Sequence, residues 1–256
     1  MTQLHFLDPN PGGAPAVLLL HGMGANCASW SLQIPRLIEA GFRPIAPDAP
    51  GFSQSPYDGT GWTIPRVSAM MMDLLTELGT GPAHVVGISM GGVIAQQLAR
   101  DQPQMISRLV LVNTFSALRP ATLGGWAYFL WRLVLVHTLG LPAQAKVVAR
   151  RIFHVSEQED LRKMLITAIT QSDPRAYRAA MRSLGLFNSK PWLIDIRIPT
   201  LVITADQDTT VNPILQGVLA RGISCARQVV ITGAGHAVTI DQPEKFNREL
   251  LRFLSE

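Results

Sequence analysis

The chain has 256 residues, 47% of them hydrophobic and 16% charged, with a formal net charge of +4. This length exceeds that of an average domain, but α/β folds of this size often form one core with an insertion. Two cysteines, Cys27 and Cys225, exclude a disulfide framework and fit a reducing compartment. The first residues lack the basic and apolar regions of a secretory signal, so we expect a cytoplasmic protein.

Short apolar runs alternate with helix-like stretches along most of the chain. The expected strands are 16–20, 43–46, 84–88, 109–113, 200–204 and 228–232. The expected helices are 30–40, 65–78, 93–100, 213–220 and 243–254. This βαβ series predicts an α/β fold with a mostly parallel central sheet and helices on both faces.

Residues 116–191 break the alternation, because several helices and no strand are expected there. We interpret 116–191 as a helical cap inserted into a core that is formed by 1–115 and 192–256. The cap has eleven Lys and Arg against four Asp and Glu, a net charge of +7. Solvated helix faces explain this charge best, and attraction of anionic substrates or of an acidic surface is the alternative.

Large apolar side chains are frequent in the cap. An apolar pocket for an acyl group is expected to be lined by Trp126, Phe129, Trp131, Phe153 and Met164. The apolar stretch 123–141 is interrupted by Arg132 and His137, so we expect no membrane span there. Packing on the core is the expected role of its helix, and docking at a membrane interface is the alternative.

The segment GISMGG at 87–92 places Ser89 between an apolar strand and a helix-like stretch. A nucleophile on such a sharp turn has a strained backbone. Side chains two positions away would collide with the neighbouring strand and helix, which explains Gly87 and Gly91. The turn exposes the Ser89 hydroxyl and aims the Met90 amide, at the positive end of the helix, at charge that develops beside it.

Three further motifs follow the carboxyl ends of expected strands, where an open parallel sheet keeps its site. HGMGAN at 21–26 supplies backbone N–H groups, ADQDTTVNP at 205–213 supplies Asp208, and GAGHAV at 233–238 supplies His236. The sequence therefore predicts that a serine, a carboxylate and an imidazole meet at one edge of the sheet.

These motifs, with PDAPGFSQS at 47–55, resemble those of the α/β-hydrolase superfamily, in its single-domain group of serine esterases and enol-lactonases. The resemblance covers nearly the whole chain. It implies that the Met23 amide is the second oxyanion donor and that Asp208, rather than Asp206, is the acid. Some relatives take their acid from the preceding strand end, where this chain has Asn113. Two loop positions, Ala205 and Ser53, depart from the glycines common in the family, and neither is a triad position.

Serine at the elbow predicts acyl-enzyme chemistry. Ser89 is the expected nucleophile, His236 its general base and then acid, and Asp208 the group that orients the imidazole. The expected substrates are small-molecule carboxylic esters or lactones, since relatives that form an alkyl-enzyme ester have Asp at this position. The alternatives are a C–C bond hydrolase, a cofactor-free perhydrolase or lyase, and a ligand-sensing protein with slow turnover.

The other polar residues have structural interpretations. His21 is expected to orient the oxyanion loop, and Asp48 to cap backbone N–H groups in its turn. Cys27 is expected to be a small core residue, with a reactive thiol as the alternative. Without metal-ligand spacing, a phosphate loop or a nucleic-acid motif in the sequence, we expect no metal, no cofactor and no nucleic-acid partner. The sequence is compatible with a homodimer as well as with a monomer.

Overall fold

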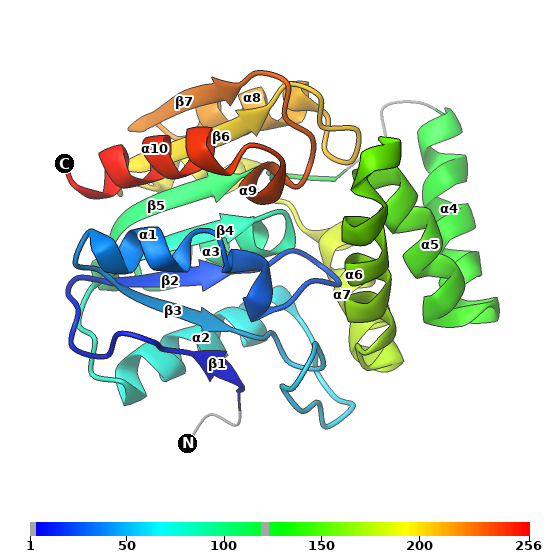
Figure 1. Ribbon diagram of the computed structural model, residues 1–256, viewed down its shortest axis with the longest axis horizontal. Coiled ribbons are helices and arrows are strands. Elements are labelled where there is room, and N and C mark those ends of the chain that lie inside the picture. Colours follow the sequence, from blue (N-terminus) through cyan, green and yellow to red (C-terminus); the bar gives the residue numbers. More distant parts are fainter. Residues whose placement is uncertain (1–3, 119–122) are drawn as a thin grey trace.

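A computed structural model describes residues 4–118 and 123–256 and contains one seven-stranded sheet. Its strands are β1 (Phe6–Leu7), β2 (Ala16–Leu20), β3 (Arg43–Pro47), β4 (Ala83–Ile88), β5 (Ile106–Val112), β6 (Thr200–Ala205) and β7 (Ala226–Ile231). Their order across the sheet is β1-β3-β2-β4-β5-β6-β7, and only β1 runs antiparallel to its neighbour (Figure 1). The carboxyl ends of six parallel strands therefore share one edge.

Both faces of the sheet are buried, which explains the uninterrupted apolar runs of its central strands. Alternate side chains of β2 belong to two different cores. Leu18 and Leu20 pack with residues of α2 and α3, whereas Val17 and Leu19 pack with residues of α1 and α10. This arrangement confirms the predicted α/β fold with helices on both faces.

Ten α-helices occur in the described residues. They are α1 (Ile34–Glu39), α2 (Ile64–Glu77), α3 (Met90–Asp101), α4 (Leu123–Thr138), α5 (Gly140–Ile152), α6 (Glu159–Thr170), α7 (Pro174–Leu186), α8 (Pro213–Gly222), α9 (Val238–Asp241) and α10 (Pro243–Leu254). None of the described helices is long and apolar enough to cross a membrane.

The helix expected at 30–40 begins only at Ile34. Residues 27–30 form a 3₁₀ turn instead, and the Asn26 side chain accepts a hydrogen bond from the Ala28 amide at its start. Pro35 then occupies the first turn of α1, where a missing N–H costs nothing. The two-residue strand β1 was not predicted, because so short a segment has no periodicity to detect.

Helices α4 to α7 lie between β5 and β6 in the chain and beyond the carboxyl edge of the sheet in space (Figure 1). The two ends of this insertion meet at its base, where the Ser189 amide donates to the Ser116 carbonyl at 2.8 Å. Ala117 and Asn188 also form an isolated antiparallel bridge. The inserted helices approach the loop after β2, since a Cβ on Gly24 would lie 2.5 Å from the Ile169 side chain.

Candidate active site

The backbone at Ser89 has the strained geometry of a sharp turn, with φ 54° and ψ −114°. The chain packs too closely here for larger residues. A Cβ on Gly87 would lie 2.3 Å from the Gly91 carbonyl oxygen, and one on Gly91 would lie 2.0 Å from the Leu20 carbonyl oxygen. Both glycines are therefore required by the turn, as the sequence predicted.

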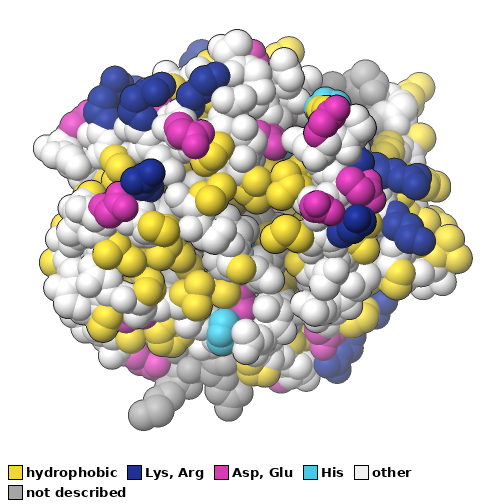
Figure 2. Space-filling view, viewed as in Figure 1, with side chains coloured by type: hydrophobic (Ala, Val, Ile, Leu, Met, Phe, Trp, Pro, Cys, Tyr) yellow, Lys and Arg dark blue, Asp and Glu magenta, His cyan; other side chains and the backbone are white. Residues whose placement is uncertain are grey.

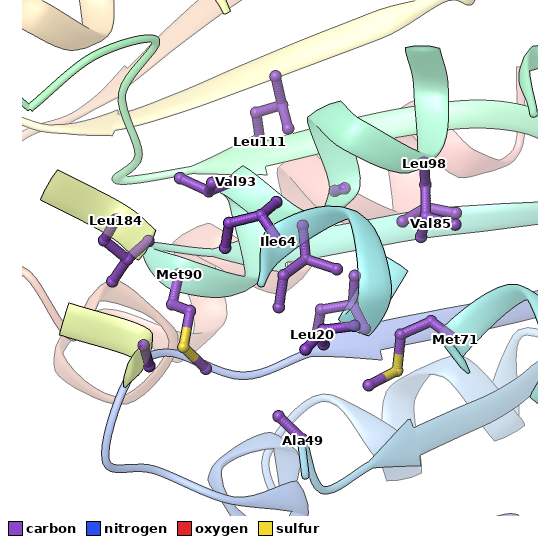
Figure 3. Packing of buried hydrophobic residues seen from close by; sticks show 14 of the residues in the cluster. Leu20, Ala49, Ile64, Met71, Val85, Met90, Val93, Leu98, Leu111 and Leu184 are labelled. Carbon is purple, nitrogen blue, oxygen red and sulfur yellow. The ribbon is translucent and has the colours of Figure 1, made fainter. Parts of the chain in front are cut away.

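Two hydrogen bonds attach this turn to the end of β5. The Ser89 amide donates to the Val112 carbonyl at 2.9 Å, and the Thr114 hydroxyl donates to the Ser89 carbonyl at 2.8 Å. The Met90 side chain is fully buried and points into the core beside Leu184 of α7 (Figure 3). Met90 is also the first residue of α3, so its N–H is among those that the helix leaves unpaired.

The loop after β2 lies against the turn, because a Cβ on Gly22 would be 3.6 Å from the Ser89 Cβ. His21 holds this loop: its Nε2 accepts from the Ala49 amide at 2.9 Å, and its Nδ1 lies 2.8 Å from the Gly22 carbonyl oxygen. Burial lowers the pKa of His21, so the imidazole is neutral with its proton on Nδ1. This is the orienting contact that the sequence indicated, and Met23 follows Gly22 directly in the same loop.

His236 and Asp208 form a buried pair. The Nδ1–H of His236 donates to Oδ2 of Asp208 at 2.8 Å, and the Asp208 side chain is completely shielded from solvent. Its Oδ1 accepts from the amides of Thr210 and Val211 at 2.8 and 2.9 Å, and Gln216 donates to Oδ2 at 3.1 Å. These donors hold the carboxylate in one orientation.

Asp206 has a different environment. It is exposed, and its Oδ1 accepts from the Gly233 amide at 2.8 Å. It therefore supports the loop that leads to His236, whereas Asp208 contacts the imidazole itself.

Asn113 connects the candidate base to the end of β5. Its backbone has a positive φ of 43°, which Asn tolerates better than most residues, and its side chain is buried. The amide nitrogen donates to the carbonyls of Gly235 and His236 at 3.2 and 2.8 Å, while the amide oxygen accepts from the Ala205 N–H at 2.9 Å. Only an amide can make all three contacts, which explains Asn here.

Replacing Asn113 by Asp should lower kcat by about 10- to 100-fold, because a carboxylate cannot donate to the two carbonyls and leaves them unpaired. The added negative charge favours the imidazolium, so the acid limb of the profile of kcat/KM against pH should move to higher pH. Asn188→Asp is the control, since the exposed side chain of Asn188 accepts from the Lys190 amide through its Oδ1. An unchanged kcat in Asn113→Asp would contradict the positioning role.

Cys27 lies in a separate cluster with the buried Asp48 and the half-buried His5. The His5 Nδ1 is 2.8 Å from Asp48 Oδ2 and 3.9 Å from the Cys27 sulfur, and Asp48 Oδ1 accepts from the Cys27 amide at 2.7 Å. Both oxygens of the Asp48 carboxylate therefore have hydrogen-bond partners, one a backbone amide and one an imidazole. This agrees with the capping role expected for Asp48. Burial and the nearby carboxylate raise the pKa of Cys27 to about 12.

Maleimide should modify Cys225 at pH 8 and leave Cys27 essentially unlabelled. The thiolate is the reactive species, and a pKa near 12 leaves a thiolate fraction of about 10⁻⁴ at this pH. Cys225 is exposed and serves as the internal control. Peptide mass mapping checks the result, and rapid labelling of a Cys225→Ser variant would show that Cys27 is a reactive thiol after all.

The structure places the five expected pocket residues in different surroundings. Phe153 is buried, and the Phe129 ring lies against Gly185. Trp131 and Met164 are 46% and 67% exposed. The side chain of Trp126 lies outside the described part of the structure.

Sequence reasoning missed three supporting residues, namely Asn113, Thr114 and Gln216. Asn113 was considered only as a position without a carboxylate. Its contacts join residues 92 and 123 positions apart, which no local pattern reveals. The one available signal was a pair of polar residues, Asn113 and Thr114, directly after an apolar strand.

Fold and site geometry together define an α/β scaffold with a serine on a strained strand-to-helix turn. Residues 17–249 match the alpha/beta hydrolase family, and the chain belongs to it. It is 31% identical to a protein of Variovorax paradoxus (strain S110) that is provisionally named a carbamate hydrolase, RutD. That alignment covers 98% of this chain and 96% of the relative.

Two solved structures are similar over nearly their whole length. The enol-lactonase from Burkholderia xenovorans LB400 superimposes with a TM-score of 0.90 at 26% identity, covering 99% of this chain and 96% of that chain. A thermophilic esterase from Thermogutta terrifontis, solved with malate bound, gives a TM-score of 0.87 at 26% identity, covering 98% of this chain and 93% of that chain. The comparisons thus support a hydrolase and leave the substrate open.

Proposed function

We propose that this hydrolase cleaves carboxylic esters or lactones through an acyl-enzyme intermediate. One observation carries the proposal: consecutive residues at the end of β5 hold both partners. Val112 accepts from the Ser89 amide, and Asn113 binds the His236 carbonyl. Nucleophile and base are thereby anchored to one strand end, with the base paired to Asp208.

In the proposed reaction, His236 Nε2 takes the proton of the Ser89 hydroxyl as the oxygen attacks the substrate carbonyl. Asp208 stabilises the imidazolium and keeps its tautomer. The Met23 and Met90 amides donate to the oxyanion, and the dipole of α3 favours the developing negative charge. His236 then protonates the leaving alkoxide, and water releases the acyl group by the same steps.

We further propose that α4 to α7 act as a cap, residues 116–191, that selects the acyl group. The burial of Phe153 and the position of Phe129 favour these two as lining residues, while Trp131 and Met164 are the weaker candidates because they face solvent. Carbamates are the second candidate substrates, favoured by the similarity to the carbamate hydrolase RutD.

A sulfonyl fluoride or organophosphonate tests the proposed nucleophile. It should inactivate the enzyme by modifying Ser89 alone, because Ser89 is the serine that we propose to have both a base and an oxyanion hole. Peptide mass mapping locates the label. A label on Ser53 or Ser55 would contradict the proposal.

Substrate class is tested with nitrophenyl butyrate, nitrophenyl octanoate, a succinate half-ester and a nitrophenyl carbamate at low and high salt. An apolar pocket should favour the longer uncharged acyl groups by up to about fourfold per buried methylene. A flat chain-length profile with a strongly salt-sensitive succinate rate would show that the basic cap governs entry instead. Faster carbamate than ester turnover would make carbamates the substrate class.

A further inference from the structure

The solvent side of α4 is unusually apolar for a surface helix. We define the outer face of α4 as a set of five exposed residues, each three or four positions from at least one other member: Leu123, Ala127, Leu130, Trp131 and Val134. The exposed fractions of Leu130, Trp131 and Val134 are 56%, 46% and 59%. Such a continuous stripe differs from singly scattered apolar residues and marks an interaction surface.

The helix that packs against α4 carries exposed basic residues, and acidic residues are missing from this part of the sequence. Residues 102–156 contain no Asp or Glu at all. Lys146 and Arg150 occupy exposed positions one turn apart on α5, which packs against α4. Over α4 and α5, at the right of the view, hydrophobic side chains lie beside groups of Lys and Arg (Figure 2).

Three acidic residues come next along the chain, and two of them are paired within their own helix. On α6, Glu159 pairs with Arg162, and Asp160 pairs with Lys163. The third, Glu157, accepts a hydrogen bond from the Ser156 hydroxyl. Lys146 and Arg150 form no salt bridge within the described residues.

Two kinds of partner could cover the outer face of α4, and the charge distribution distinguishes between them. A second copy of the chain in a symmetric dimer would present the same patch, which would place Lys146 and Arg150 near their own equivalents. An anionic lipid surface complements the charges instead, and its interface accommodates Trp, Tyr and Leu side chains. The Trp131 ring, packed 5.8 Å from that of Tyr128, has the amphipathic character that suits this boundary.

We propose that the outer face of α4, together with Lys146 and Arg150, docks the protein on membrane surfaces that contain anionic lipid. The docked helix belongs to the insertion that lies over the carboxyl edge of the sheet, so the site would be held close to lipid-dissolved substrates. The surface itself does not depend on the proposed ester specificity.

Vesicle co-sedimentation of the full chain tests the proposal. Binding is expected to vesicles of phosphatidylcholine with phosphatidylglycerol and to be weak to phosphatidylcholine alone. It should fall steeply with salt, since each cation near the surface contributes about fivefold in affinity at low ionic strength. Val134→Glu should weaken binding at least about tenfold, and a Lys146→Ser, Arg150→Ser double variant should weaken it comparably.

Ile214→Glu is the matched control, because Ile214 is 72% exposed on α8, outside the insertion. Circular dichroism and hydrolysis of a soluble ester verify that the variants are folded. Three results would overturn the proposal: equal binding to neutral vesicles, binding that Val134→Glu leaves intact, and no vesicle binding at all. If the chain binds no vesicles and sediments as a dimer that Val134→Glu dissociates, the outer face of α4 is a dimer interface instead.

Discussion

Ser89→Ala and His236→Ala are each expected to lower kcat/KM for an activated ester by about 10⁴-fold or more. The serine contributes the attacking oxygen and the histidine removes its proton, so neither step proceeds when one partner is missing. The double variant should lose little beyond the worse single variant, because the two residues act as one unit. A residual rate of roughly 10³-fold over water should remain from the oxyanion donors.

Steady-state kinetics on the three variants measures this effect, with Ser53→Ala as the control. Ser53 has a positive φ of 49° in the loop after β3, so it shares this feature of the backbone with Ser89 but lies outside the proposed triad. Additive losses in the double variant would indicate that Ser89 and His236 act separately. A large loss in Ser53→Ala would place the nucleophile in the other loop.

The second large effect is expected at Asp208. Asp208→Asn keeps the size of the side chain but puts an amide opposite His236 Nδ1, which favours the wrong imidazole tautomer and removes the charge that stabilises the imidazolium. We expect kcat to fall by about 10³- to 10⁴-fold. Asp206→Asn retains the oxygen that accepts from Gly233, so its loss should stay within about tenfold.

The two variants control for each other, because they make the same chemical change two residues apart. Thermal unfolding should show that both fold. If Asp206→Asn proves the more damaging in kcat while both remain folded, the acid assignment is wrong and Asp206 orients the base.

Much of the scaffold was predictable because its causes are local. A strand buried on both faces must be apolar throughout, so β2, β4, β5 and β6 were found with small errors at their ends. Proline defines the first turn of α10 and of α8, and their predicted starts were correct. The predicted start of α1 was wrong, because the 3₁₀ turn that Asn26 caps has the same apolar spacing as a helix.

The candidate site was likewise predictable only where its causes are local in the sequence. The sequence alone determined the elbow, because Gly87 and Gly91 are demanded by contacts within one strand-turn-helix unit and with the next strand. Only the tertiary structure decided what else supports His236 and Asp208: Asn113 and Gln216 reach them through hydrogen bonds that no local pattern reveals. It also decided that one side of α4 faces solvent, since an apolar helix has the same sequence pattern whether a partner covers it or not. The physical reason is that local patterns encode backbone conformation, whereas the pairing and exposure of a side chain depend on which remote segments the folded sheet brings beside it.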